Sequence, residues 1–303
     1  MQSTQLRHSV MLLFAAFFWG TTFVAQDIAA DTLPTFTYTA IRSFVAVGFL
    51  WVVMQIFDRR GIVTHKPAST AERKTLWIGG LFCGCILFAS TNLQQYGMAD
   101  STAGKAGFIT AMYIILVPIV GIFFGKHFPW TMLLGTIIAL IGLYLLCMTG
   151  SEGLQSGDFF ILLCAFCFTA HILMVDHFSP LVDGVRLSWI QFFVVGALSS
   201  LCAVFTEHVT FSQVLSCTGP ILYAGILSSG VAYTLQILGQ KNLNPTIAGL
   251  VMSVESVFSV LASWLFLHES MSTRQIIGCV LMFLAILLAQ IPSKTTTTQK
   301  DLP

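Results

Sequence analysis

The chain has 303 residues, of which 56% are hydrophobic and only 9% are charged, and its formal net charge is +1. Soluble domains carry about 25% charged residues, so this composition excludes a soluble globular protein and indicates an integral membrane protein. The near-neutral charge favours no nucleic-acid partner. We therefore expect the lipid bilayer to be the main partner of the chain.

Predominantly apolar runs, each close to the roughly 20 residues that a helix needs to cross a bilayer, recur ten times. The first run follows Arg7 and His8, but its length and the nine runs behind it favour a retained helix over a signal peptide. The pattern predicts an all-α integral membrane protein with ten transmembrane helices. These cover about 9–27, 35–57, 75–95, 103–124, 130–149, 158–176, 187–206, 219–239, 246–267 and 274–291.

The basic residues predict the orientation, because cytoplasmic loops of membrane proteins are enriched in Lys and Arg. A cytoplasmic amino terminus places 11 of the 14 Lys and Arg inside, and an even number of spans returns the carboxyl terminus there. We expect a multi-pass protein of the cell inner (cytoplasmic) membrane with both termini in the cytoplasm. The inside residues would be Arg7, Arg59, Arg60, Lys66, Arg73, Lys74, Lys126, Arg186, Lys241, Lys294 and Lys300.

Two stretches of the first half recur in the second half. LLFAAFF (12–18) aligns with LLCAFCF (162–168), and FFGKHFPWTMLLG (123–135) aligns with FLHESMSTRQIIG (266–278). Both matches fall at equivalent places, namely the first span and the turn from the fourth span to the fifth. The chain therefore contains an internal repeat.

Five spans per repeat is an odd number, so the two repeats must cross the membrane in opposite orientations. We predict a first five-helix repeat at 1–150, a second at 151–292, and a disordered cytoplasmic tail at 293–303. Inverted repeats are typical of secondary transporters, whose binding site lies at the interface of the repeats near the bilayer midplane.

Two charged side chains fall well inside the apolar runs, away from their ends. Glu255 lies near the middle of LVMSVESVFSVLASWLFL (250–267), where a charge costs about 2.5 to 3.5 kcal/mol on insertion scales. It is either a protonated carboxyl bonded to a neighbouring helix or a group that binds an amine or carries a proton. Arg42 in the second run is either a snorkelling, structural arginine or an anchor for an anionic substrate. A direct pair between Arg42 and Glu255 stays open.

Neutral polar and aromatic side chains at membrane depth complete the candidate site. Each one alone is explained by helix packing, but as a set drawn from both halves they could line a pocket. His171 also titrates near neutral pH, which suits proton coupling as well as a buried packing role. With Arg42 and Glu255, the substrate-binding candidates are Trp19, Thr22, Thr110, Tyr113, His171, Tyr233 and Gln236, while Gln191 and Ser253 add further neutral groups.

Four motifs in order resemble the EamA-type members of the drug/metabolite transporter superfamily. The Trp-Gly of the first span, the Arg of the second, the Pro of the fourth and the Glu of the ninth all fit. The chain departs from the family's frequent Glu-Pro at Ser256, so a bend caused by proline cannot be assumed there, and from its Gly-Glu at His268. The motifs are WGTTFVAQ (19–26), PTFTYTAIRSF (34–44), FITAMYIILVPIVGIFFGK (108–126) and VESVFSVLASWLFLHE (254–269).

The resemblance implies a ten-helix carrier of the inner membrane, without ATP hydrolysis, that moves small metabolites, amino acids or drugs, often outward. We accordingly expect a secondary transporter for an amino acid, amine, carboxylate or drug-like solute, working by alternating access around a central pocket. We expect no cofactor, no metal and no catalytic residue, and a monomer or weak homodimer. Proton coupling, substrate identity and direction stay open.

Two other classes of protein compete with this interpretation. A membrane-embedded enzyme would need a catalytic cluster, and neither H-E-x-x-H nor G-x-S-x-G occurs. GIFFGK (121–126) is one residue short of a phosphate-binding P-loop and lacks the following Ser or Thr, which argues against a primary pump. An oligomeric channel could take one Glu255 from each subunit, but an inverted repeat within one chain favours a carrier.

Overall fold

The computed structural model describes residues 2–61, 67, 69–101, 103–123, 130–148, 155–241, 243–266 and 271–289. Every regular element in these ranges is a helix. Eight described helices or helix pairs are long and apolar enough to cross a membrane, and the runs predicted at 130–149 and 274–291 fall on shorter apolar helices. The prediction of an all-α membrane protein is therefore confirmed.

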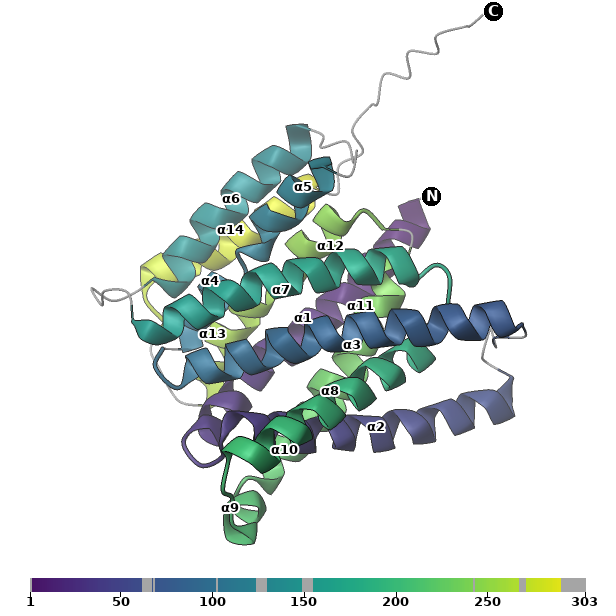
Figure 1. The fold of residues 1–303 in the computed structure, drawn as a ribbon. Coiled ribbons are helices and arrows are strands. Elements are labelled where there is room, and N and C mark those ends of the chain that lie inside the picture. Colours follow the sequence, from purple (N-terminus) through teal and green to yellow (C-terminus); the bar gives the residue numbers. More distant parts are fainter. Residues whose placement is uncertain are drawn as a thin grey trace, which may run out of the picture.

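The elements follow the predicted runs closely in chain order (Figure 1). They are α1 (Gln2–Ala30), α2 (Thr35–Arg60), α3 (Thr70–Met98), α4 (Ala103–Thr110), α5 (Tyr113–Phe123), α6 (Trp130–Cys147), α7 (Ser156–Phe178), α8 (Gly184–Thr206), α9 (Phe211–Ser216), α10 (Thr218–Tyr223), the π-helical η1 (Ala224–Ala232), α11 (Tyr233–Gln240), α12 (Pro245–Met252), α13 (Glu255–Phe266) and α14 (Thr273–Ala289).

Local capping explains where several helices begin and end. The Ser69 hydroxyl accepts a hydrogen bond from the Glu72 amide at the start of α3, and the Asp183 carboxylate accepts one from the Arg186 amide at the start of α8. Gly61 ends α2 with a φ of 64°, a left-handed conformation that glycine adopts without a steric penalty. These caps satisfy backbone groups that the helices themselves leave unpaired.

Helices from distant parts of the sequence pack against one another. The α6–α14 pair forms one edge of the bundle in Figure 1, while α2 packs against α8 on the other side. Between them, α3 packs on α7 and α8, and α1 packs on α11, η1 and α13. The α6–α14 contact needs glycine on both helices, since a Cβ at Gly142 would lie 3.0 Å from the Gly278 carbonyl oxygen and one at Gly278 would lie 2.7 Å from that of Gly142.

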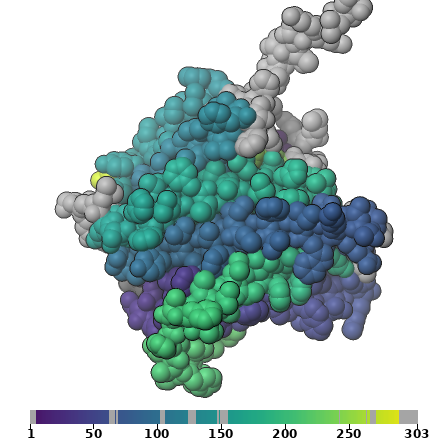
Figure 2. All heavy atoms as spheres, in the orientation of Figure 1, coloured from purple at the N-terminus to yellow at the C-terminus, as the bar shows by residue number. Residues whose placement is uncertain are grey.

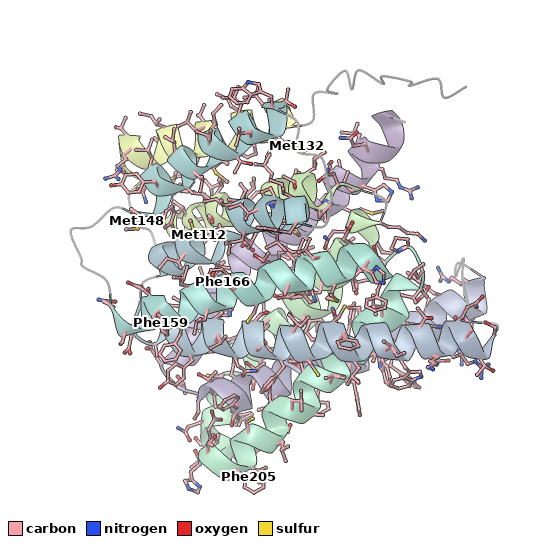
Figure 3. The ribbon with its side chains drawn as sticks, turned by 45° about the horizontal axis from the view of Figure 1, so that its top comes forward. Met112, Met132, Met148, Phe159, Phe166 and Phe205 are labelled. Atoms are coloured by element: carbon pink, nitrogen blue, oxygen red, sulfur yellow. The ribbon has the colours of Figure 1, made fainter. Side chains whose placement is uncertain are left out.

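The outer surface carries large apolar side chains. Figure 3 shows Phe159 and Phe166 on α7 and Phe205 near the end of α8, and their side chains are 60%, 52% and 80% exposed. In Figure 2 the side chains of α3, α7 and α8 form one closely packed face. So much exposed apolar surface would be a liability in water, whereas in a bilayer it is the surface that contacts lipid.

Two of the predicted spans are interrupted instead of continuous. The run predicted at 103–124 breaks at Ala111–Met112 between α4 and α5, and the run predicted at 246–267 breaks at Ser253–Val254 between α12 and α13. The two interruptions therefore lie 142 residues apart, at equivalent places in the proposed repeats. Each break contains tighter bonds to the residue three positions earlier, such as Ile114 N to Ala111 O at 3.0 Å and Val257 N to Val254 O at 2.9 Å.

The causes of the two interruptions differ. Pro118 in α5 has no N–H to donate to the carbonyl of Ile114, which weakens the first turn of α5 just after the break. The second break contains no proline, in line with the serine at position 256. Instead, the Ser253 hydroxyl donates to the Leu250 carbonyl at 2.8 Å, and such back-bonding competes with the helical hydrogen bonds. A side-chain hydroxyl thus accompanies a bend where a proline could not be assumed.

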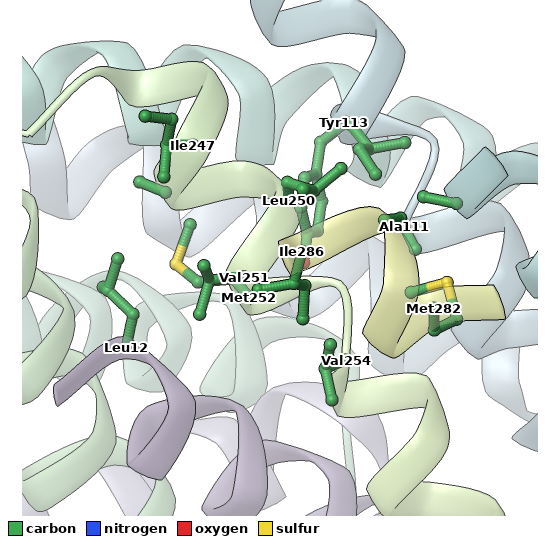
Figure 4. Packing of buried hydrophobic residues seen from close by; sticks show 14 of the residues in the cluster. Leu12, Ala111, Tyr113, Ile247, Leu250, Val251, Met252, Val254, Met282 and Ile286 are labelled. Carbon is green, nitrogen blue, oxygen red and sulfur yellow. The ribbon is translucent and has the colours of Figure 1, made fainter. Parts of the chain in front are cut away.

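The largest buried cluster surrounds α12 and joins both halves of the chain. Figure 4 shows Leu250, Val251 and Met252 packed among Tyr113 of α5 and Ile286 of α14. This apolar packing holds the interrupted helices together, and Tyr113 and Met252 also border the cavity described below. The span predicted at 219–239 passes instead through α10, η1 and α11, and so contains a π-helical segment.

Candidate functional site

A small cavity lies where the interrupted helices meet α1, α2, α3, α7, η1 and α11. Its volume is about 40 Å³, which is room for only a few water molecules. In this conformation the surrounding side chains must separate before a metabolite can enter. The cavity is therefore too small for a metabolite in this conformation.

Seven of the nine predicted binding residues line this cavity. They come from helices of both halves, so the structure brings together residues separated by more than 200 positions. The seven are Trp19, Arg42, Thr110, Tyr113, Tyr233, Gln236 and Glu255.

Glu255 is the first residue of α13 and is 6% exposed. The Tyr113 hydroxyl, on the first residue of α5, donates a hydrogen bond to Glu255 Oε1 at 3.1 Å. Two half-helices therefore begin side by side and are linked through this bond. A helix amino terminus carries partial positive charge, which stabilises a carboxylate placed there.

The backbone around Glu255 is closely packed. A Cβ at Gly20 of α1 would overlap the Glu255 carbonyl oxygen and would lie 2.9 Å from the Ser259 amide nitrogen. Gly20 thus lets α1 approach the first turn of α13. The Trp-Gly pair of the sequence therefore has two roles here, since Trp19 lines the cavity and Gly20 permits the helix contact.

Arg42 is 5% exposed and its Nε–H has no acceptor. The guanidinium carbon lies 5.2 Å from the centroid of the Tyr38 ring, a cation–π contact. Within the described part of the chain Arg42 forms no ion pair, and the hydrogen bond to Glu255 comes from Tyr113 instead. The direct Arg42–Glu255 pair, which the sequence left open, is therefore not formed in this conformation.

The π-helical segment η1 packs against the backbone of α2 at Arg42. A Cβ at Gly225 of η1 would lie 2.9 Å from the Arg42 carbonyl oxygen, so η1 packs directly on α2. Ser228 of the same segment lines the cavity. Short π-helical segments often occur at functional sites because they shift side chains out of the regular helical register.

Several neutral polar atoms at the cavity also lack partners. Gln236 is 2% exposed and its Oε1 accepts no hydrogen bond, and Trp19 Nε1 donates none. By contrast, Gln94 Nε2 donates to Thr110 Oγ1 at 3.2 Å. The Trp19 and Tyr233 rings meet edge to face with centroids 4.8 Å apart. Unpaired buried polar groups are costly, so these atoms are available to hydrogen-bond a molecule that enters the cavity.

The remaining two predicted residues, Thr22 and His171, do not line the cavity. The Thr22 hydroxyl donates to the Phe18 carbonyl of its own helix at 2.6 Å. His171 Nε2 lies 3.2 Å from Gln191 Oε1, and its ring packs against Tyr233 with centroids 6.0 Å apart. For both residues the contacts agree with the alternative that the sequence analysis left open, namely a role in helix packing.

The prediction missed three polar residues that line the cavity, namely Gln26, Gln94 and Ser228. Gln94 could have been found from the repeat. Gln94-x-x-Gly97 recurs as Gln236-x-x-Gly239 at a distance of 142 residues, the same distance that separates the two helix interruptions. Gln26 has no counterpart in the second repeat that could have identified it. Its side-chain Nε2 donates a hydrogen bond to Gln95 Oε1 at 3.1 Å. The apolar lining residues Phe23, Phe168, Ile172 and Met252 were not predicted either.

Comparison with known proteins relates the whole chain to transporters. An uncharacterized transporter of Archaeoglobus fulgidus is 29% identical over 92% of this chain and 84% of that protein. A WAT1-related chloroplast protein of Arabidopsis thaliana is 25% identical over 93% of this chain and 69% of that protein. A solved crystal structure, 18% identical, superposes with a TM-score of 0.75 over 93% of this chain and 96% of that one, and so shares the fold.

The same relationship appears twice within the chain. Residues 7–148 match the EamA-like transporter family, and residues 155–290 match it again. These two segments cover nearly all of the sequence and all the helices that line the cavity. The chain belongs to the EamA-like transporter family.

Proposed function

We propose that this membrane transporter is a secondary carrier that exports a small metabolite by alternating access around the cavity between two inverted repeats. The observation that carries the proposal is the small cavity lined by polar and apolar residues of both halves, with unpartnered buried atoms on Arg42 and Gln236. A small amino acid, amine, carboxylate or drug-like solute would supply the missing partners. Export follows the direction common in the family that the sequence resembles.

The pattern of helix contacts supports the division into repeats at 1–150 and 151–292. In an inverted repeat each contact has a counterpart in which the two halves exchange roles. The contact of α3 with α7 has its counterpart in that of α11 with α1, and the contact of α1 with α13 has one in that of α7 with α4 and α5. The α2–α8 and α6–α14 pairs are their own counterparts. The two separate family matches agree with this division.

The interrupted helices supply a mechanism. Alternating access needs one group of helices to rock against another around a fixed site. The breaks before Tyr113 and before Glu255 lie at the cavity and divide two spans into halves that can change their relative angle. Solute binding between them would favour the angle that closes the cavity on one side of the membrane.

A metabolite screen followed by reconstitution tests the proposal. Cells that overproduce the protein would be compared with cells that lack it, with metabolites measured both inside and in the medium. The solute found would then be assayed in proteoliposomes, where a carrier saturates and shows counterflow. Flux without saturation or counterflow would indicate a channel, and chemical conversion of the solute would indicate an enzyme.

The proposed orientation has its own test. Probes at Thr64 and Thr297 should report the cytoplasm and a probe at Ser151 the outside; all three positions lie outside the described residues. If Ser151 and Thr297 appear on the same side, the five-plus-five inverted arrangement and the cytoplasmic location of both termini are wrong. A monomer or weak homodimer is expected on purification.

A further inference from the structure

The pair of helices α2 and α8 is joined by polar contacts at both of its ends. At the start of α2, the Glu207 carboxylate accepts hydrogen bonds from the Phe36 and Thr37 amides at 2.8 Å and from the Thr37 hydroxyl at 2.7 Å. At the other end, Arg186 near the start of α8 forms an ion pair with Asp58 of α2 at 2.8 Å. Each helix is long and apolar enough to cross the membrane, so the two contacts lie toward opposite membrane faces.

The contact at Glu207 serves as the amino-terminal cap of α2. Pro34 stands at the N-cap position and has no side-chain oxygen that could accept hydrogen bonds from the first turn. The Glu207 carboxylate, which directly follows α8, accepts these bonds instead and lies at the positive end of the helix dipole. Because hydrogen bonds to a charged acceptor are stronger than neutral ones, the end of α8 is held firmly to the start of α2.

The same two helices also pack against each other between their ends. Ala46 and Leu50 of α2 lie in one buried apolar cluster with Phe192 and Val195 of α8. The contact therefore extends from one membrane face to the other instead of being confined to a single crossing point.

The two end contacts occupy equivalent places in the proposed repeats. Arg186 follows Phe36 by 150 residues and Glu207 follows Asp58 by 149, close to the 150-residue shift of the first repeat motif. At each end a carboxylate near the end of one helix binds the first turn of the other. The partner is a pair of backbone amides at one end and a guanidinium at the other.

This equivalence has a consequence for movement under the proposed inverted repeat. Exchanging the two halves converts the state open to one membrane face into the state open to the other. The α2–α8 pair is its own counterpart, so the exchange also swaps its two ends. Both ends are joined in the present conformation, and both are therefore joined after the exchange as well.

The contacts that change in such an exchange are those that now differ between the halves. A Cβ at Gly20 would overlap the Glu255 carbonyl oxygen, so α1 and α13 are in close contact. By contrast, α7 and α5 leave a groove of about 500 Å³, lined by Val120 and Ala170 among others. The present conformation is therefore asymmetric at these crossings, while the α2–α8 pair is joined at both faces.

Resting on the function proposed above, we propose that α2 and α8 move as one rigid unit throughout the transport cycle, joined at both membrane faces by the Glu207 and Asp58–Arg186 contacts. Arg42 lies on α2 between these contacts, so its depth in the membrane is fixed relative to α8. The cavity then has one wall of fixed position, which carries Arg42, and another that moves, formed by α5 and α13.

Covalent links between the two helices test the proposal. Thr37→Cys with Glu207→Cys joins one end and Asp58→Cys with Arg186→Cys the other, in a chain whose eight native cysteines are replaced by alanine or serine. The shortest bis-methanethiosulfonate linker that reacts with each pair is used. Each unlinked pair should have a lower melting temperature than the cysteine-free chain, because a contact is lost, and linkage should restore it.

Release of metabolites measures transport without a known solute. Proteoliposomes are loaded with a metabolite extract of the cells, and the compounds released are measured by mass spectrometry. Linkage at either end of the α2–α8 pair should leave release as fast as in the cysteine-free chain. In the matched control, Val120→Cys linked to Ala170→Cys, the linker occupies the groove and release should be lost.

The outcomes separate this inference from the proposed function. If linkage at either end of the α2–α8 pair stops the release that the unlinked variant shows, this contact is a gate and the rigid unit is wrong, while the carrier stands. If the linked groove variant releases metabolites as fast as the unlinked one, alternating access is wrong. If the unmodified chain releases nothing beyond protein-free liposomes, the carrier is wrong. Either end alone can overturn the rigid unit, so one variant that does not fold leaves the other to decide.

Discussion

The crossing of α1 with α13 and the crossing of α7 with α5 occupy equivalent places in the proposed repeats, yet they are packed differently. At the first, Gly20 brings the backbones together at Glu255. At the second, Ala170 takes the place of Gly20 under the 150-residue shift of the first repeat motif. There the helices leave a groove of about 500 Å³, lined by Gly121, Ala170 and Leu173.

The two crossings thus differ in packing within one conformation. An inverted-repeat carrier must be asymmetric in any single state, because identical halves would open to both sides of the membrane or to neither. The groove lies along the part of α7 that ends at Phe178, and the predicted orientation would put this end toward the cytoplasm. Under the proposed alternating-access mechanism, the two crossings would exchange their packing when the protein changes conformation.

A substitution that forces α1 and α13 apart at Gly20 should have the largest effect on folding and transport. Gly20→Leu would force side-chain atoms into the backbone of α13 at Glu255 and Ser259, and neither backbone group can move aside. Overpacking of this kind costs roughly 1 to 3 kcal/mol or more, so we expect loss of most folded protein and of transport. Yield of monodisperse protein in size-exclusion chromatography, melting temperature and uptake would measure it.

Ala170→Leu is the matched control for that prediction. Because Ala170 borders a groove instead of a backbone, the larger side chain should fit, and the protein should fold with a melting temperature close to that of the unmodified chain. Equal behaviour of the two variants would show that the two crossings do not differ as described.

Replacing the carboxyl group of Glu255, at the crossing of α1 with α13, should abolish transport without unfolding the protein. Glu255→Gln keeps the size of the side chain and its bond from Tyr113, so expression and melting temperature should be nearly unchanged. Transport that depends on pH or on a cationic group should be lost. Glu72→Gln at the start of α3, away from the cavity, serves as the control. Normal transport with an unaltered pH profile in Glu255→Gln would leave the carboxyl only a structural role.

A substitution at Arg42 tests the cavity without changing either crossing, because Arg42 lies on α2. In Arg42→Lys the positive charge remains, but a planar fork of donors becomes a point charge. The protein should fold normally and bind its solute more weakly, by about tenfold or less, which appears as a raised KM at similar yield. If transport kinetics do not change, Arg42 is structural and anchors no substrate group.

The link between the two interrupted helices should have the smallest effect. Tyr113→Phe removes the bond from α5 to Glu255 but keeps the ring in its apolar cluster. Hydrogen bonds between membrane helices are worth about 0.6 kcal/mol on average and at most about 1.7. We therefore expect a melting temperature a few degrees lower and a modest change in transport rate. Tyr144→Phe on the exposed face of α6 should change neither quantity.

Much of the site could be predicted from the sequence because polar residues at membrane depth are rare. Arg42 and Glu255 stood out for their cost in lipid, and both line the cavity. Thr22 and His171 stood out in the same way and do not, since a position along the sequence gives the depth of a side chain but not the direction in which it points. Gln94 was missed although a counterpart, Gln236, was chosen.

The helical spans and the membrane class follow from the sequence by itself. In lipid every backbone group must be satisfied within its own segment, so apolar length alone specifies a helix, and the predicted runs coincide with helices to within a few residues at most ends. The basic residues and the internal repeat are likewise read directly from the chain.

Only the tertiary structure decided where those helices break and which polar groups meet. The break before Glu255 coincides with a hydrogen bond from the Ser253 hydroxyl to the Leu250 carbonyl, and η1 departs from the α-helical register where it packs on α2. These helices are apolar on nearly every side, so no amphipathic pattern marks the face that turns inward. Which face lines the cavity is set by the neighbouring helices, through contacts as local as that of Gly20 with α13.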